Sequence, residues 1–261
     1  MITAASNSRI KRLVQLNQKS KLRRTEDVFL AEGVKMFLEA PREQLQEVYV
    51  SESFLEKCSC REHLEEVGYE VVSDSVFSKI SDTCTPQGVL CVLKQFHYNI
   101  EEMLRDKAPL FLLLENIQDP GNLGTMLRTG EGAGVSGIIM SRDTVDLYNP
   151  KVIRSTMGSI YRVPFYYADD FAAAVHQVQQ AGVSVYAAHL RGKNSYACQD
   201  YTKETAFLIG NEGNGLREET AELADCYIRI PMEGKVESLN AAVASSILMY
   251  EAHRQRATIE K

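Results

Sequence analysis

The chain has 261 residues, of which 44% are hydrophobic and 25% are charged, an ordinary composition that excludes disordered, collagen-like and fibrous proteins. At about 100 to 200 residues per domain, this length allows one large domain or two modest ones, and we expect two. The net charge of −6 argues only superficially against a nucleic-acid partner, because residues 1–25 carry seven basic side chains and no acidic one. Residues 26–261 carry 22 basic and 35 acidic side chains.

The six cysteines have neither the paired spacing of a zinc ribbon nor the density of a secreted disulfide scaffold. Only Cys58 and Cys60 lie close together. The first 16 residues lack the apolar core of a signal peptide, and no run approaches the roughly 18 apolar residues of a membrane span. We therefore expect a cytoplasmic protein with no membrane association and no metal site.

The first hundred residues combine helical and strand-like patterns. Apolar residues recur at helical spacing over residues 8–18, and a second helical pattern covers residues 34–40. Short apolar or strand-like runs occupy residues 28–33, 47–51, 70–74 and 88–96. This pattern predicts a small α/β domain. The charged stretch 97–108 has no apolar alternation, which predicts a short helix or linker and a domain boundary near Lys107.

The second half alternates strand and helix signals. Strands are expected at residues 109–116, 136–141, 163–167, 183–190, 206–213 and 226–232. Helices are expected directly after the first of these strands and at residues 149–155, 170–181 and 239–254. Continuous apolar strands that alternate with helices predict a mostly parallel sheet covered on both faces.

Three glycine-rich segments follow strands of this predicted sheet, at residues 116–134, 208–216 and 230–244. Each has an ordinary structural interpretation, with glycines in turns, Arg128 as a surface arginine and Ser238 as a helix cap. Because the carboxyl ends of parallel strands meet at one edge, we expect the three segments to lie together, where open α/β sheets bind ligands.

Two phosphate-binding motifs are absent from these segments. A dinucleotide fingerprint would open the turn after the first strand with G-x-G-x-x-G, but Gly121 and Gly124 form G-x-x-G there. The Gly-Lys pairs lack the Ser or Thr that completes a P-loop. A nicotinamide-dependent oxidoreductase and a nucleotide hydrolase are therefore disfavoured.

The motifs N-L-G-x-x-x-R-T, G-N-E-G-x-G-L and I-P-M-x-G-x-x-x-S-L-N-x-x-V-A together resemble those of the SpoU, or TrmH-type, RNA 2'-O-ribose methyltransferases of the SPOUT superfamily. The N-terminal patterns S-N-S-R-I-K-R-L and F-L-A-E-G are similar to the substrate-binding domain that often precedes them, which is related to a ribosomal RNA-binding protein fold. The resemblance implies an α/β protein with a mostly parallel sheet and a C-terminal deep trefoil knot. It places an RNA-binding domain at residues 1–106 and a methyltransferase domain at residues 107–261.

The resemblance implies transfer of a methyl group from S-adenosylmethionine to a ribose 2'-hydroxyl of ribosomal RNA, at an active site completed across a homodimer. A transfer RNA substrate, or a non-catalytic RNA-binding protein that retains the fold, are the alternatives. By motif position, catalysis falls on Asn122, Arg128, Glu212, Ser238 and Asn240. Cofactor contacts fall on Ala188, His189, Leu208, Ile209, Gly210, Ile230, Met232 and Leu239. The basic N-terminal segment would bind RNA through Arg9, Lys11, Arg12, Arg23 and Arg24.

The sequence departs from the family pattern at two places. The third motif reads S-L-N-A-A-V-A where the family has S-L-N-V-S-V-A, and the first continues R-T-G-E-G-A-G in place of R-T-A-x-A-x-G. Both changes exchange small residues and keep the polar ones, so we expect altered packing and unchanged chemistry. Because a guanidinium group stays protonated in proteins, we expect Arg128 to orient the 2'-oxygen or a phosphate rather than to act as a bare base.

Overall fold

The computed structural model describes residues 1–236 and 238–257. The chain forms two compact units, one of residues Met1–Phe96 and Asp146–Tyr161 and the other of residues His97–Val145 and Arg162–Lys261. No helix in the described part of the chain has both the length and the apolar character needed to cross a bilayer.

The division between the units differs from the boundary predicted near Lys107, because the segment before it packs with the second unit. The rings of Tyr98 and Phe165 meet edge to face at 5.3 Å between centroids, and Ile100 and Met103 are buried in the core of the second unit. The charged residues of this stretch are exposed, which hid its anchoring apolar residues from the sequence pattern.

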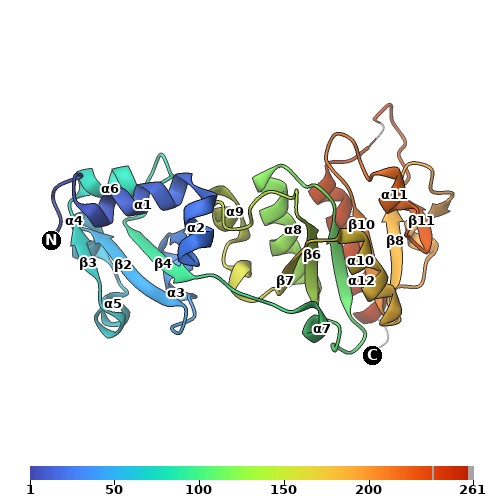
Figure 1. The fold of residues 1–261 in the computed structure, drawn as a ribbon, viewed down its shortest axis with the longest axis horizontal. Coiled ribbons are helices and arrows are strands. Elements are labelled where there is room, and N and C mark those ends of the chain that lie inside the picture. Colours follow the sequence, from blue (N-terminus) through green and yellow to red (C-terminus); the bar gives the residue numbers. More distant parts are fainter. Residues whose placement is uncertain (237, 258–261) are drawn as a thin grey trace. The chain divides into compact units, whose positions relative to one another are not determined.

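The first unit is built on a four-stranded sheet with the order β1-β4-β2-β3 (Figure 1). Only β2 and β3 run parallel. Its strands are β1 (Val28–Glu32), β2 (Leu45–Ser51), β3 (Glu70–Val72) and β4 (Val89–Lys94). Its helices are α1 (Ser8–Gln18), α2 (Ser20–Glu26), α3 (Val34–Leu38), α4 (Glu52–Lys57), α5 (Arg61–Val67), α6 (Asp74–Ile80) and α9 (Pro150–Thr156), with the 3-10 turn η1 (Ser159–Tyr161). Helix α1 buries Ile10, Leu13 and Leu16 in a core shared with α6 and the sheet.

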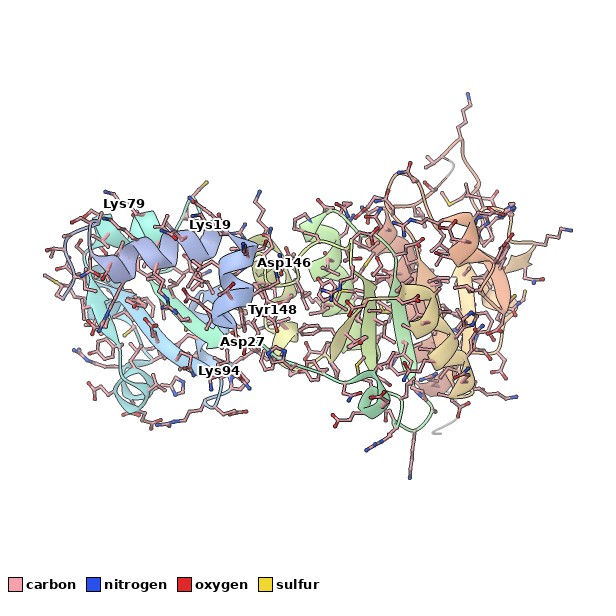
Figure 2. All side chains as sticks on the ribbon, in the orientation of Figure 1. Lys19, Asp27, Lys79, Lys94, Asp146 and Tyr148 are labelled. Carbon is pink, nitrogen blue, oxygen red and sulfur yellow. The ribbon has the colours of Figure 1, made fainter. Side chains whose placement is uncertain are left out.

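Residues 146–161 fold into the first unit although they lie between two strands of the second unit in sequence. The Tyr148 hydroxyl donates to the carbonyl of Phe96 (3.1 Å), and its ring lies 4.8 Å from that of Phe29. Asp146 accepts a hydrogen bond from the Arg23 guanidinium (2.6 Å). Figure 2 labels Asp146 and Tyr148. The segment is therefore an integral part of the first unit, which the sequence pattern did not indicate.

The second unit is built on a seven-stranded sheet whose paired strands are all parallel. The order is β7-β6-β5-β10-β8-β11-β9. Its strands are β5 (Leu110–Leu114), β6 (Gly137–Ser141), β7 (Phe165–Ala168), β8 (Ser184–Ala188), β9 (Asn194–Ser195), β10 (Thr205–Ile209) and β11 (Cys226–Arg229). Its helices are α7 (Ile100–Met103), α8 (Pro120–Ala133), α10 (Phe171–Gln180), α11 (Glu218–Ala221) and α12 (Ala241–Ala257), with the 3-10 turn η2 (Tyr196–Cys198). The predicted α/β class with a mostly parallel sheet is confirmed.

The helices cover both faces of this sheet, as the continuous apolar strands predicted. Figure 1 shows α10 and α12 on opposite faces. Alternate side chains such as Phe111 and Leu113 share one core with Val175 of α10, and α12 packs against α8 and β10. The strand order changes direction between β5 and β10, since β6 and β7 follow on one side and β8 and β11 lie on the other. This switch point is where an open α/β sheet offers a crevice at the carboxyl ends of its strands.

Candidate active site

Two of the predicted catalytic residues meet at the switch point of the sheet. Glu212 follows β10, and its carboxylate accepts hydrogen bonds from the Asn122 side-chain amide (3.0 Å) and from the backbone N–H groups of Gln118 and Asp119 (3.0 Å each). Those three donors follow β5 and open α8, where Asp119 is the N-cap. The loop after β10 is thus fastened to the start of α8.

Asn240 extends this chain of hydrogen bonds to the last helix. Its side-chain N–H donates to Oδ1 of Asn122 (2.9 Å), while its own Oδ1 accepts from the N–H groups of Ala242 and Val243. Asn240 therefore caps α12, and the interpretation of Ser238 as the cap is wrong, because the helix begins at Ala241. Glu212, Asn122 and Asn240 link all three sequence motifs.

The hydrogen bonds keep the Glu212 carboxylate in its ionised form. Partial burial raises its pKa, but hydrogen bonds from the Asn122 amide and from the backbone N–H groups of Gln118, Asp119 and Glu212 lower it further, so the net pKa lies below the ordinary value of a glutamate. An ionised Glu212 accepts hydrogen bonds only, which fixes the direction of the Asn122 amide. The carbonyl of Asn122 must then face Asn240, as observed.

The loop between Gly210 and Leu216 folds back on itself through two hydrogen bonds between the backbones of Asn211 and Gly215 (2.9 and 3.0 Å). A Cβ at Gly210 would lie 2.2 Å from the backbone of Gly215, so only glycine fits there. Oδ1 of Asn211 accepts from the N–H groups of Gly213 and Asn214, and its amide donates to Asn116 (2.8 Å). Asn211 was not among the predicted residues, although it stands inside the second motif.

A cavity of about 470 Å³ opens beside this loop, at the carboxyl ends of β8, β10 and β11. Its volume falls within the range of small-molecule sites. The residues that line it are Ala188, His189, Leu190, Arg191, Ile209, Gly210, Asn211, Glu212, Gly213, Asn214, Gly215, Leu216, Ile228, Arg229, Ile230, Met232, Ser238, Leu239, Ala241 and Ala244. The apolar side chains among them and the exposed loop backbone suit an adenosine, which presents a flat apolar ring with a polar edge.

Seven of the eight predicted cofactor residues line this cavity, and only Leu208 does not. Leu208 is buried in the core on β10. His189 is hydrogen-bonded through Nδ1 to the backbone N–H of Arg191 (3.2 Å). Burial, and then the nearby Arg191 charge, lower the pKa of His189, so its imidazole is neutral at pH 7.

Four of the five predicted catalytic residues lie at the cavity or are hydrogen-bonded to a residue that lines it, and Arg128 is the exception. Glu212 and Ser238 line the cavity, and Asn122 and Asn240 are joined to Glu212 by hydrogen bonds. Arg128 lies on the exposed face of α8 and does not line the cavity of its own chain. Its guanidinium has no hydrogen-bond or ion-pair partner among residues 1–236 and 238–257.

A carboxylate that sequence reasoning missed lies next to the site. Glu115, only 1% exposed, follows β5 and accepts hydrogen bonds from the N–H of Arg217 (2.8 Å) and the hydroxyl of Thr220 (2.5 Å). The Arg217 guanidinium also pairs with Asp143. A charged residue directly after five apolar strand residues was the available signal for a buried, bound carboxylate.

The predicted RNA-binding residues of the first unit differ in exposure. Lys11 and Arg24 are exposed, whereas Arg9 pairs with Glu70 and Arg12 lies between two carboxylates. The structure contradicts the prediction that Arg23 binds RNA. The Arg23 side chain is only 3% exposed and donates to the carbonyls of Leu16 and Asn17 and to the Asp146 carboxylate. A side chain so enclosed does not reach an RNA phosphate. The predicted RNA-binding surface therefore consists of Arg9, Lys11, Arg12 and Arg24.

Comparisons with known proteins agree with this site. Residues 109–250 match the model of the SpoU rRNA Methylase family. The chain belongs to this family. Residues 7–91 match the MRM3-like substrate binding domain. The SpoU family predicted from the three motifs is thereby confirmed.

Individual relatives share most of their length with this SpoU family member. The 23S rRNA (guanosine(2553)-2'-O)-methyltransferase RlmP of Bacillus subtilis is 32% identical over 95% of this chain and 97% of its own. An S-adenosylmethionine-bound rRNA methyltransferase from Sinorhizobium meliloti superposes with a TM-score of 0.84 at 31% identity, over 97% of both chains. The SpoU methyltransferase AviRb of Streptomyces viridochromogenes, with S-adenosylmethionine, gives 0.87 at 26% identity, over 97% of this chain and 99% of that one.

The described residues offer no competing metal centre. Across residues 1–236 and 238–257, no three His, Cys, Asp or Glu side chains are grouped so that they could hold a metal ion.

Proposed function

We propose that this protein transfers a methyl group from S-adenosylmethionine to a ribose 2'-hydroxyl of ribosomal RNA. The observation that carries the proposal is the hydrogen-bonded chain Glu212–Asn122–Asn240, which joins the three SpoU motifs beside a cavity of cofactor size. The relatives named as 23S rRNA 2'-O-methyltransferases agree with the reaction and with the choice of ribosomal RNA.

The cofactor would occupy the cavity between the loops after β8, β10 and β11. It supplies a methyl group on a positively charged sulfur that becomes neutral when the methyl leaves. Ile209, Ile230 and Leu239 provide apolar walls, and the missing side chain of Gly210 lets the loop backbone at Gly215 fold close against β10 beside the cavity. Leu208 would act indirectly, through the position of β10.

The protein's own task is to align the ribose oxygen and to deal with its proton. Good alignment of reacting groups contributes about 7 to 11 kcal/mol to a displacement of this kind. The hydrogen bonds between Glu212, Asn122 and Asn240 hold the three motifs in fixed positions beside the place where the ribose oxygen would bind. Ser238 presents a hydroxyl at the cavity wall. Arg128 binds the 2'-oxygen or a neighbouring phosphate and stabilises the negative charge that develops on oxygen.

The exposed position of Arg128 supports an active site shared by two copies of the chain. Val243 and Tyr250 stand two turns apart on α12, and both are about half exposed. The Tyr250 hydroxyl lies 3.0 Å from the point where a Cβ on Gly132 would be, and Gly132 is one turn beyond Arg128 on α8. The face made of Arg128, Gly132, Val243 and Tyr250 would therefore pair with its equivalent, which brings Arg128 to the cavity of the partner subunit.

The remaining features of the proposal concern the fold and the location. The family and the 0.84 to 0.87 TM-scores support a trefoil knot in the C-terminal part of the sheet. The match of residues 7–91 supports RNA substrate binding by the N-terminal domain. A protein that modifies ribosomal RNA would work in the cytoplasm without a resident metal.

The deciding experiment is transfer of labelled methyl from S-adenosylmethionine to bulk RNA from cells that lack this gene. Label that resists alkaline cleavage as a 2'-O-methyl dinucleotide, and is lost with Arg128→Ala, is expected. Label in the transfer RNA fraction alone would shift the substrate to transfer RNA. Cofactor binding without label would point to a missing substrate state, such as an assembling ribosomal particle. Neither label nor cofactor binding would favour a non-catalytic RNA-binding protein.

A further inference from the structure

Three basic residues on the segments that border the cavity, Lys193, Arg229 and Lys235, have no hydrogen-bond or ion-pair partner in residues 1–236 and 238–257. Arg229 lines the cavity itself. Lys193 comes directly before β9, the strand that pairs with β11 beside Arg229. Lys235 is in the loop whose two ends, at Met232 and Ser238, both line the cavity.

The neighbouring Arg191 differs from these three residues because its guanidinium is already paired with a carboxylate of the chain. The Arg191 guanidinium forms two hydrogen bonds to the carboxylate of Glu218 (2.5 and 2.6 Å) and lies 5.9 Å from the centre of the Tyr227 ring. Its charge is therefore already matched within the chain. The loop from Met232 to Ser238 also carries two acidic residues, Glu233 and Glu237, which offset part of the remaining positive charge.

Two exposed apolar side chains stand on the same loops. Leu190 is 63% exposed and lines the cavity, and Val236 is 62% exposed and directly follows Lys235. Unpaired cations beside exposed apolar side chains suit single-stranded nucleic acid, because phosphates meet the charges while the faces of unstacked bases meet the apolar groups.

The charge of the cofactor argues against the alternative that these cations bind it. S-adenosylmethionine carries a sulfonium, an ammonium and one carboxylate, so its net charge is positive, and the excess of basic over acidic side chains on the segments beside the cavity would repel it. An RNA strand carries one negative charge per phosphate and is attracted. The excess charge is therefore complementary to the RNA and opposed to the cofactor.

We infer that Leu190, Lys193, Arg229, Lys235 and Val236, here named the pocket rim, hold the RNA nucleotides that flank the methylated ribose. This inference rests on the proposed function and adds a second RNA-binding surface to the one expected on the N-terminal domain. The rim would hold the strand in a splayed conformation, so that one ribose enters the site while its neighbours stay on the surface.

The test removes two rim charges outside the cavity lining, in the double variant Lys193→Ala/Lys235→Ala. The matched control is Lys107→Ala/Lys203→Ala, which removes two exposed charges from the opposite, amino edge of the same sheet. RNA binding is measured over a range of salt concentrations with ribosomal RNA fragments from cells that lack the gene. S-adenosylmethionine binding is measured separately by calorimetry.

The rim variant should bind RNA more weakly, with a slope of log affinity against log salt reduced by about 1.4, at roughly 0.7 per lost phosphate contact on a single strand. The control should keep the wild-type slope, and both variants should bind S-adenosylmethionine as the wild type does. Equal losses in both variants, weaker cofactor binding with unchanged RNA binding, or no change at all would each overturn the inference.

A third variant separates the apolar contribution from the charges. Val236→Ser should weaken RNA binding without altering the salt slope, because no charge is lost. Unchanged RNA affinity of this variant would remove Val236 from the rim. These binding measurements remain decisive even if the wild type transfers no methyl group, a result that would contradict the proposed function alone.

Discussion

Glu115 and Glu212 each follow one of two neighbouring parallel strands, and each accepts hydrogen bonds from residues that follow the other strand. Glu115, after β5, binds Arg217 and Thr220, which come after β10. Glu212, after β10, binds the start of α8, which comes after β5. The two carboxylates thus hold the first and second motifs together from both sides of the switch point.

Replacement of Glu115 by glutamine should loosen this connection. A glutamine has only one acceptor oxygen, so its amide N–H must face either the Arg217 N–H or the Arg217 guanidinium, and a buried polar group left without its partner costs about 1 to 3 kcal/mol. We expect that loss in urea unfolding, together with weaker S-adenosylmethionine binding. Asp143→Asn is the control, because Asp143 is 42% exposed and its pairing with Arg217 should contribute less than about 1 kcal/mol. Equal effects of both substitutions would contradict a special role for Glu115.

Glu212 should stabilise the protein in a pH-dependent way. Its folded pKa is depressed, so its stabilising contribution is complete above the unfolded glutamate pKa of about 4.3 and is lost as the pH falls through the lower folded value. The difference in unfolding free energy between wild type and Glu212→Gln should therefore be largest at neutral pH and shrink under acid conditions. Urea titrations at several pH values measure it, and a difference that does not change with pH would refute this prediction.

Gly210→Ala should disrupt the loop that borders the cavity. Its Cβ would lie 2.2 Å from the backbone of Gly215, so the loop must move, at a cost of about 1 to 3 kcal/mol, and cofactor binding should be lost. Gly213→Ala in the same loop is the matched control, since its nearest neighbour would be Oδ1 of Asn211 at 3.6 Å. Calorimetric titration with S-adenosylmethionine separates the two. Full binding by Gly210→Ala would show that the cofactor does not use this loop.

A shared active site predicts that two inactive variants restore activity when mixed. Arg128→Ala and Asn122→Ala should each lose methyl transfer, by about a hundredfold or more if each removes one group that positions the reacting oxygen. Random subunit exchange should then restore roughly a quarter of the wild-type activity, because half of the dimers are mixed and each holds one intact site. No recovery after verified exchange would place Arg128 and Asn122 in the same chain's site.

The sequence was most informative where one residue type has a single physical use. The strands of the second unit were located because they are continuous apolar runs. Gly210 was predicted by its motif position, and the close approach of the Gly215 backbone explains why only glycine fits there. The motifs predicted the residues of the cavity through the family resemblance. Their hydrogen bonds could not be predicted, because Glu212 meets Asn122 across 90 residues of sequence.

Elements of the first unit were harder to predict for a related reason. Helices α2, α4, α5 and α6 have six or seven residues each, too few to show a clear apolar period. Arg23 looked like part of a basic surface, since charge alone does not reveal that a guanidinium binds two carbonyls and a carboxylate inside the fold. The partner Asp146 is 123 residues away.

The assignment of residues 146–161 to the first unit has a consequence for the construction of chimeric proteins from relatives. The chain passes from one unit to the other at residues 96/97, 145/146 and 161/162, so no single cut separates the two. A fragment that begins at residue 97 would carry α9 without β1, and Val152 and Ile153, now buried, would face water. An exchange of the first unit between relatives must therefore transplant both stretches, residues 1–96 and 146–161. A chimera that receives only the N-terminal stretch would mismatch the packing of α9 on β1, which favours aggregation.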